Sequence, residues 1–163
     1  DIYIANSDGS NLRRLTEHPG EDWISSWSPD GSQIAFESKR DGNYEIYVVN
    51  IDGSHPQRLT ENTVQDGAPK WSPDGAKIAF FSRRDGTPEI YVMDLDGGNP
   101  LRLTNRAGDD SFPAWSPDGA WLVFSSGNNQ QAEIYLISAD GSQQQPLTAN
   151  DAQNWTPAWR PAP

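Results

Sequence analysis

The sequence contains no cysteine and only two histidines among its 163 residues. The absence of cysteine excludes disulfides and thiolate metal sites. No apolar run approaches the roughly 20 residues of a membrane-spanning helix, and no segment has the character of a signal peptide. The Gly-x-Ser-x-Gly and His-Glu-x-x-His signatures and the phosphate-binding loop are missing as well. These absences argue against a membrane span and against several classes of enzyme.

Positive charge is scarce. Twelve Lys and Arg residues stand against 23 Asp and Glu residues, which gives a formal net charge of -11 at pH 7. Because phosphate groups are bound by basic surfaces, nucleic acid is a poor candidate partner, and none is predicted. We expect cationic ligands, metal ions or basic protein surfaces instead.

A tandem repeat accounts for most of what is present. The pentapeptide WSPDG occurs at 27–31, 71–75 and 115–119, and a truncated copy, WRPAP, occupies 159–163. Its tryptophans, Trp27, Trp71, Trp115 and Trp159, are spaced by 44 residues. Such a strict period is typical of repeat architectures. We expect the tryptophans to pack between repeats and Pro-Asp-Gly to form a tight turn.

Each repeat is predicted to contain four short strands. An acid-Ile-Tyr triplet, an Asp-Gly pair, a Leu-Thr pair and an apolar segment such as AKIAFFS recur in register without an insertion. Proline recurs at intervals that would break helices. The predicted fold class is therefore all-β, a β-propeller of four-stranded antiparallel blades with a 44-residue repeat and about 3.7 repeats in the chain. A β-sandwich is the alternative, but sandwiches rarely keep an exact sequence period.

The array is expected to form one domain over 1–163 that contains incomplete blades. Residues 1–16 are predicted to be the outer strands of a split blade, 20–60, 64–104 and 108–148 complete blades, and 152–160 an innermost strand. Because Asp1 lies inside a repeat, an upstream segment could have been removed. Either the chain is part of a longer propeller, or its two ends pair, within one chain or between two copies. We therefore expect self-association or additional blades from a parent chain.

The repeat resembles a known family. Residues 71–104 follow the TolB-type β-propeller repeat, W-S-P-D-G-x-x-I-A-F-x-S-x-R-D-G-x-x-E-I-Y-V-M-D-x-D-G, almost letter for letter. That resemblance implies a periplasmic or extracellular location and protein partners, as in the propeller of the Tol-Pal system. Related propellers are attached to peptidase or lyase domains.

An oxygen-bearing side chain stands five residues before each repeat tryptophan: Asp22, Asp66, Asp110 and Asn154. In a propeller these positions lie at the mouth of the central channel. One interpretation is a ring that binds a cationic group, with Asp22, Asp66 and Asp110 as carboxylate ligands of Ca²⁺. The alternative is that each aspartate caps its loop or pairs with Arg40 or Arg84 of the RDG turns.

The repeats diverge at the next position. Trp23 and Trp155 occupy it in the outer repeats, whereas Gly67 and Ser111 occupy it in the middle ones. Two tryptophans at a channel mouth suit a sugar face, a proline-rich peptide or a protein anchor, and burial between loops is the alternative. The predicted ligand-binding set is therefore Asp22, Trp23, Asp66, Asp110, Asn154 and Trp155.

The sequence therefore predicts a non-catalytic binding or scaffolding module that engages a protein, peptide or glycan at the channel-mouth loops. No catalytic residue and no cofactor other than Ca²⁺ is predicted. The alternative is the propeller portion of a larger hydrolase or lyase that gates or positions substrate. A metal-dependent polysaccharide lyase would need metal ligands that two unpaired histidines do not supply.

Overall fold

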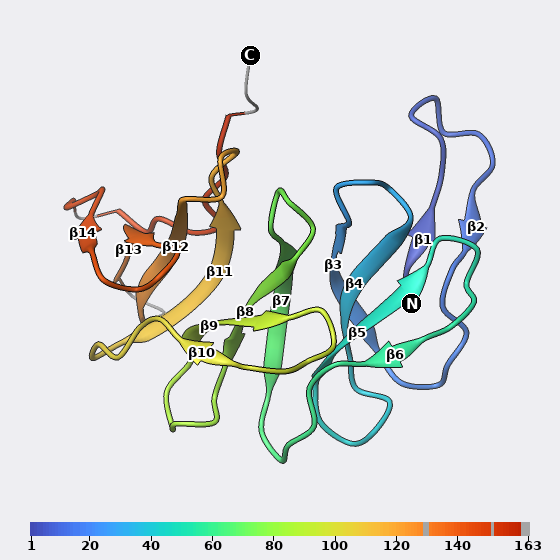
Figure 1. The fold of residues 1–163 in the computed structure, drawn as a ribbon, viewed down its shortest axis with the longest axis horizontal. Helices are drawn as coiled ribbons and strands as arrows, with labels where there is room; N and C mark the ends of the chain where they lie inside the picture. Colours follow the sequence, from blue (N-terminus) through green and yellow to red (C-terminus); the bar gives the residue numbers. More distant parts are fainter. Residues whose placement is uncertain (129–130, 151, 161–163) are drawn as a thin grey trace.

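The computed structural model describes residues 1–163 except 129–130, 151 and 161–163 (Figure 1). The described residues form strands and turns without a helix, so none of them makes a helix that could cross a membrane. Three four-stranded antiparallel sheets and one two-stranded sheet stand side by side in chain order. This arrangement confirms the predicted all-β, open and partial propeller.

Each sheet is a meander of consecutive strands. The half-blade contains β1 (Tyr3–Ile4) and β2 (Arg13–Arg14). The first blade contains β3 (Asp22–Trp27), β4 (Gln33–Ser38), β5 (Glu45–Asn50) and β6 (Gln57–Arg58). The second contains β7 (Asp66–Trp71), β8 (Lys77–Ser82), β9 (Glu89–Asp94) and β10 (Leu101–Arg102). The third contains β11 (Asp109–Trp115), β12 (Trp121–Asn128), β13 (Gln131–Ser138) and β14 (Gln144–Pro146).

The hydrophobic core consists of layers between neighbouring sheets. One layer joins Ile46 and Val48 of the first blade to Trp71 and Phe80 of the second, and two similar layers lie on either side of it. Alternation of side chains along each strand supplies an apolar row to both faces of a blade. Each fully buried phenylalanine contributes about 1.5–3 kcal/mol by leaving water. The blades therefore depend on their neighbours for stability.

The WSPDG segments perform the predicted turn chemistry. In the first copy the Ser28 hydroxyl donates to Asp30 Oδ1 at 2.6 Å, and Gly31 adopts a φ of 71°. The tryptophans join successive blades, since the Trp115 Nε1–H donates to the carbonyl of Lys70 at 3.1 Å. Trp27 is the exception to the predicted packing, with 52% of its surface exposed. The half-blade next to it has no innermost strand among the described residues that could cover the ring.

The segment 152–160 differs from its prediction. It follows the path of an innermost strand, because Asn154 N–H donates to Ala132 O at 2.9 Å and Trp159 Nε1–H donates to Ala114 O at 3.1 Å. No strand is formed there, however, and β1 and β2 pair only with each other. Without a neighbouring strand on its outer side, the segment lacks the ladder of hydrogen bonds that defines a strand. The described residues therefore do not close into a ring.

Candidate functional site

One end of the blades carries the loops predicted to form the channel mouth. We call it the loop face; it comprises residues 17–21, 61–65 and 105–108, which lead into the innermost strands, and the hairpin residues 39–44 and 83–88. The two sets meet, because Asp66 N–H donates to Tyr44 O and Asp110 N–H donates to Pro88 O, both at 2.9 Å. These loops lie along the lower side of Figure 1, opposite the WSPDG turns.

Asp22 lies in a pocket of its own blade. Its two carboxylate oxygens each lie 3.3 Å from Arg40 Nη2. The Arg40 Nε–H donates to Ser38 Oγ at 2.8 Å, and the guanidinium lies over the rings of Phe36 and Tyr47. We call this set of a carboxylate, a hydroxyl and two rings around a guanidinium an arginine seat. The arginine seat pairs the Asp22 carboxylate with a guanidinium of its own blade.

The second blade repeats this arrangement. Arg84 Nη2 lies 3.1 Å from Asp66 Oδ2, and Arg84 Nε–H donates to Ser82 Oγ at 2.8 Å. Asn62 adds a hydrogen bond of 2.7 Å to the same Asp66 oxygen. Burial raises the pKa of Asp66, and the Ser82 hydroxyl and the Arg84 charge oppose this effect. Asp66 is therefore engaged within its own blade.

Asp110 has a different environment in the third blade. Its side chain is fully buried, and neither carboxylate oxygen has a hydrogen-bond partner among the described residues. Burial raises the pKa of Asp110 to about 6, although the nearby Ser126 and Thr104 hydroxyls act in the opposite direction. The residue that corresponds to Arg40 and Arg84 is Asn128. The third blade therefore has no hairpin arginine for this carboxylate.

Asn154 is held against the third blade, because its Nδ2 donates to Glu133 Oε2 of β13 and to Asn150 Oδ1, both at 3.1 Å. No group of three or more acidic or histidine side chains in the described part of the chain is placed to hold a metal ion. The predicted Ca²⁺ ligands, Asp22, Asp66 and Asp110, lie in three successive blades. The described geometry gives the Ca²⁺ site no support, because two of these carboxylates are paired with arginine.

The two predicted tryptophans lie at opposite ends of the array. Trp23 is 56% exposed on the first blade, whereas Trp155 is half-buried, with its ring 6.5 Å from that of Phe112. At the equivalent Gly67 a Cβ would lie 2.3 Å from Glu37 Oε2 and 2.7 Å from Phe81 Cε1, so a larger residue would displace these side chains. At Gly67, therefore, the neighbouring side chains leave room only for a small residue, which explains why the repeats differ at this position.

A β-bulge on each innermost strand was not predicted from the sequence. The register of β3, β7 and β11 shifts in each case just after the diverging position. The bulged residues are not glycines, although their φ angles are positive: Ile24 (28°), Ala68 (52°), Phe112 (54°) and, in 152–160, Thr156 (51°). Non-glycine residues rarely adopt this conformation, and β-branched ones least of all. The residue types give no sign of the bulge. The sequence could have indicated it only because the four residues occupy the same position in the 44-residue repeat.

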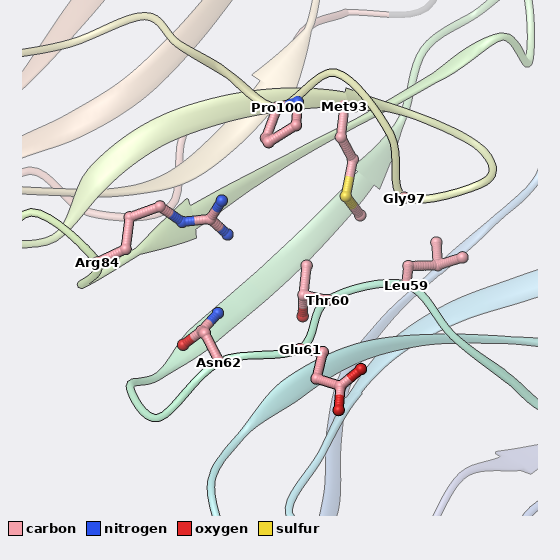
Figure 2. Close-up of a pocket in the computed structure, with 8 residues that line it drawn as sticks. All are labelled: Leu59, Thr60, Glu61, Asn62, Arg84, Met93, Gly97 and Pro100. Atoms are coloured by element: carbon pink, nitrogen blue, oxygen red, sulfur yellow. The ribbon is translucent and has the colours of Figure 1, made fainter.

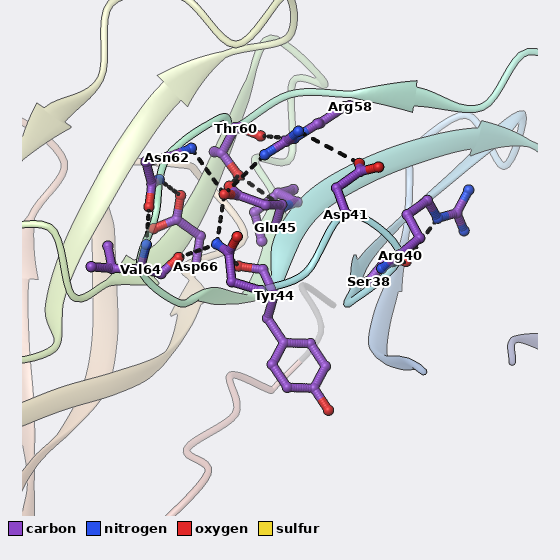
Figure 3. Close-up of polar contacts among 12 residues, drawn as sticks. Ser38, Arg40, Asp41, Tyr44, Glu45, Arg58, Thr60, Asn62, Val64 and Asp66 are labelled. Atoms are coloured by element: carbon purple, nitrogen blue, oxygen red, sulfur yellow. Dashed lines mark hydrogen bonds and ion pairs between the residues drawn. The ribbon is translucent and has the colours of Figure 1, made fainter. Parts of the chain in front are cut away.

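The acid of each acid-Ile-Tyr triplet serves the scaffold (Figure 3). Glu45 is fully buried and accepts hydrogen bonds from Thr60 Oγ1 at 2.5 Å, Asn43 Nδ2 at 2.7 Å and the Asn62 N–H at 2.9 Å. Arg58 Nη2 lies 3.2 Å from the same carboxylate. Glu89 repeats the contacts with threonine and arginine in the second blade. Because their oxygens are occupied, these glutamates fasten the outermost strand to its blade.

A cavity of about 260 Å³ lies between the first and second blades (Figure 2). An equivalent cavity lies between the half-blade and the first blade, with corresponding residues 44 positions earlier, such as Leu15 for Leu59 and Arg40 for Arg84. Gly97 in the wall has a φ of 83°, and a Cβ there would lie 2.2 Å from Leu59 O. The recurrence shows that blade packing creates these cavities.

Comparison with known proteins gives a consistent result. The model of the TolB beta propeller domain family matches residues 1–66 and 61–162. A curated relative, the Protein TolB homolog of Chlorobium luteolum, is 44% identical over 46 residues, which are 28% of this chain and 11% of that protein.

Solved structures extend the likeness over nearly the whole chain. TolB from Acinetobacter baumannii has a TM-score of 0.86 at 27% identity, over 98% of this chain and 40% of its own. Putative TolB from Agrobacterium tumefaciens has a TM-score of 0.81 at 30% identity, over 94% of this chain and 61% of its own. The chain thus spans less than two thirds of these relatives. An oligogalacturonate lyase from Vibrio parahaemolyticus shares the fold alone, at 16% identity and a TM-score of 0.70 over 98% of this chain and 50% of its own.

Proposed function

The chain belongs to the TolB beta propeller domain family, and from this premise we propose that it is a non-catalytic module that binds a protein, peptide or glycan at its loop face. We also propose a periplasmic or extracellular location, which family membership supports. Because the relatives are longer than this chain, the proposal concerns the propeller portion itself.

The repeated bulge beside the loop face is the observation that carries the proposal. A left-handed, non-glycine residue costs of the order of 1–3 kcal/mol, and such residues gather at functional sites. Bulges also redirect side chains at the ends of strands. Here every innermost strand has one at the same place, although Ile24, Ala68 and Phe112 share no local preference for it. The bulge therefore supports a surface shaped for binding.

The chemistry of the loop face also suits a protein or peptide partner. Lys39 lies 5.7 Å from the centroid of the Tyr44 ring, and the Tyr44 hydroxyl donates to Glu21 Oε2 at 2.5 Å. Arg106 lies 4.2 Å from the centroid of the Tyr135 ring on the third blade. Tyrosine and arginine are enriched at protein interfaces, where they combine apolar area with hydrogen bonds. The exposed Trp23 is the feature that would suit a glycan.

A role as the propeller of a larger hydrolase or lyase has no specific support from these residues. The likeness to oligogalacturonate lyase is one of fold, and fold alone does not carry function. The buried Glu45 and Glu89 are engaged by the scaffold. We therefore retain the binding function.

Selection from a displayed library of random peptides tests the proposal. Selected peptides are expected to lose affinity for Glu21→Lys and Glu61→Lys, which reverse exposed charges on the loop face. Ala76→Lys and Ala120→Lys, exposed on the WSPDG turns at the opposite end, are the matched controls and should bind normally. Peptides that respond only to the control variants, or a selection that yields no binder, would contradict the proposed function.

A further inference from the structure

We propose that the third blade contains an arginine seat that receives the guanidinium group of an arginine side chain from a partner protein or peptide. This inference deepens the proposed binding function and rests on it for the identity of the partner. It follows from comparing three equivalent sites, two of which hold an arginine of their own.

The first two blades show which chemical group the seat accepts. The Cζ atom of Arg40 lies 5.3 Å from the ring centroid of Phe36 and 4.5 Å from that of Tyr47. Arg84 repeats this geometry at 5.5 Å from Phe80 and 4.7 Å from Tyr91. Each guanidinium also bonds a serine hydroxyl and pairs with an aspartate. A planar cation with several donors satisfies all of these contacts at once.

The third blade keeps the whole shell around this position. Phe124 and Tyr135 are paired across β12 and β13, with centroids 5.9 Å apart and an interplanar angle of 26°. The corresponding pairs in the first two blades are 5.8 Å apart at 33° and 32°. Ser126 and Asp110 occupy the places of the hydroxyl and the carboxylate, and both are buried. The receiving groups are therefore retained in form, and Tyr135 is more exposed than its counterparts Tyr47 and Tyr91.

The arginine itself is replaced. Asn128 stands at its position in the sequence and is exposed. The loop before β11 supplies Arg106 instead, whose Nη2 donates to the Tyr135 hydroxyl at 2.9 Å. Arg106 stacks on Tyr135, but among the described residues no cation lies over Phe124 and none bonds Asp110. Arg106 therefore covers the face of Tyr135 but makes no hydrogen bond to Asp110.

The uncompensated carboxylate provides the driving force for binding. A buried carboxylate without a partner is costly, and a guanidinium that both pairs with it and stacks on two rings would remove that cost. Lysine fits less well, because its ammonium cannot combine a fork of donors with a flat face. Arg106 is held by an exposed hydrogen bond and can be displaced toward solvent. An arginine side chain is therefore the ligand that the seat selects.

The test uses N-acetyl-L-arginine amide as a probe and N-acetyl-L-lysine amide as its control, with binding followed by NMR chemical shifts at pH 7.5. The arginine probe is expected to bind, and the lysine probe more weakly. Asp110→Asn should weaken binding of the arginine probe by about tenfold or more, because it removes a charge-assisted pair. The neighbouring Asp109→Asn is the matched control and should bind as the wild type does.

Two further variants change the arginines of the protein itself around the seat. Arg106→Gln removes the competing guanidinium and should bind the probe more tightly than the wild type. Asn128→Arg supplies the arginine found in the first two blades and should abolish probe binding. The proposal is overturned if neither the wild type nor Arg106→Gln binds the probe, if Asp110→Asn binds it equally well, or if Asn128→Arg leaves binding unchanged.

The outcomes also separate the seat from the proposed function. Free L-arginine should bind no more tightly than the capped probe; a tenfold preference for the free amino acid would overturn the assignment to a protein or peptide arginine. Selected peptides that bind Asp110→Asn as well as the wild type would exclude the seat but leave the binding function standing. Probe binding without any selected peptide would support the seat and contradict the wider function.

Discussion

The indole of Trp115 donates a hydrogen bond of 3.1 Å from Nε1 to the carbonyl of Lys70, across the boundary between the second and third blades. Trp159 makes the same bond to Ala114 at the same distance. These two repeat tryptophans thus reach back to the innermost strand of the preceding blade, whereas the buried Nε1 of Trp71 has no such partner among the described residues. This link makes the stability of one blade depend on its neighbour.

Replacing Trp115 with phenylalanine should lower the free energy of unfolding by about 1 kcal/mol through the lost hydrogen bond, and further through the unfilled volume. Trp27→Phe is the control, because the half-exposed Trp27 makes no such bond in the described part of the chain. Urea denaturation measures both. Equal losses in the two variants would contradict a specific role for the link between blades.

Asp110 should make the protein less stable as the pH rises. Its pKa is about 6 in the folded protein, above the ordinary 3.8, so the folded state holds the proton more tightly than the unfolded state. The stabilising effect of the proton is complete below 3.8 and is lost as the pH rises through about 6. Asp110→Asn should therefore raise stability near pH 8 by up to roughly 3 kcal/mol and flatten this part of the profile. Thermal melts from pH 4 to pH 8 measure the effect, and an unchanged profile would refute it.

Replacing the equivalent aspartate of the first blade, Asp22, with asparagine should lower the stability of the protein, whereas Asp110→Asn should raise it. Asp22→Asn leaves the largely buried Arg40 guanidinium without its carboxylate, which should cost about 1–3 kcal/mol of stability at pH 7. The free energy of unfolding of both variants, measured by denaturant titration beside the wild type, tests both expected effects. Stabilisation by Asp22→Asn would show that its pairing with Arg40 is not a net benefit.

Gly97→Ala should destabilise the protein far more than Gly9→Ala, although the two glycines occupy the same position in their repeats. Both have a left-handed φ, 83° and 82°. A Cβ on Gly97 would meet Leu59 O at 2.2 Å, whereas a Cβ on Gly9 would meet nothing within 4 Å. We expect a loss of about 1 kcal/mol at Gly9 from the backbone alone and at least about twice that at Gly97. Similar losses would mean that the contact between blades relaxes freely.

The face of the first blade that carries Trp27 should promote self-association, because this tryptophan leaves 52% of its surface exposed to water. Light scattering over a range of concentrations is expected to give a mass above that of the 18.0 kDa chain. Trp27→Glu should shift the population toward the monomer. A wild-type protein that remains a monomer at high concentration would rule out association through this face.

Much of the architecture could be predicted because its causes are local. The Pro-Asp-Gly turns and the strands between them follow from short-range preferences that the period repeats. The bulges could not be predicted in this way, because Ile24 and Ala68 do not favour a positive φ. Contacts between strands and blades impose that conformation.

The sequence by itself determined the period, the four strands of each blade, the turn at every WSPDG copy and the family. Each of these depends on residues close together in the chain. Only the tertiary structure decided which aspartates pair with an arginine: Arg40 and Arg84 reach Asp22 and Asp66 across 18 residues. In the third blade the fold brings Arg106 onto Tyr135 and leaves Asp110 without a hydrogen-bond partner among the described residues. The physical reason is that burial and the reach of a side chain depend on neighbouring strands and blades, which repeat spacing does not specify. The exposure of Trp27 was decided in the same way, by the absence of an innermost strand beside it among the described residues.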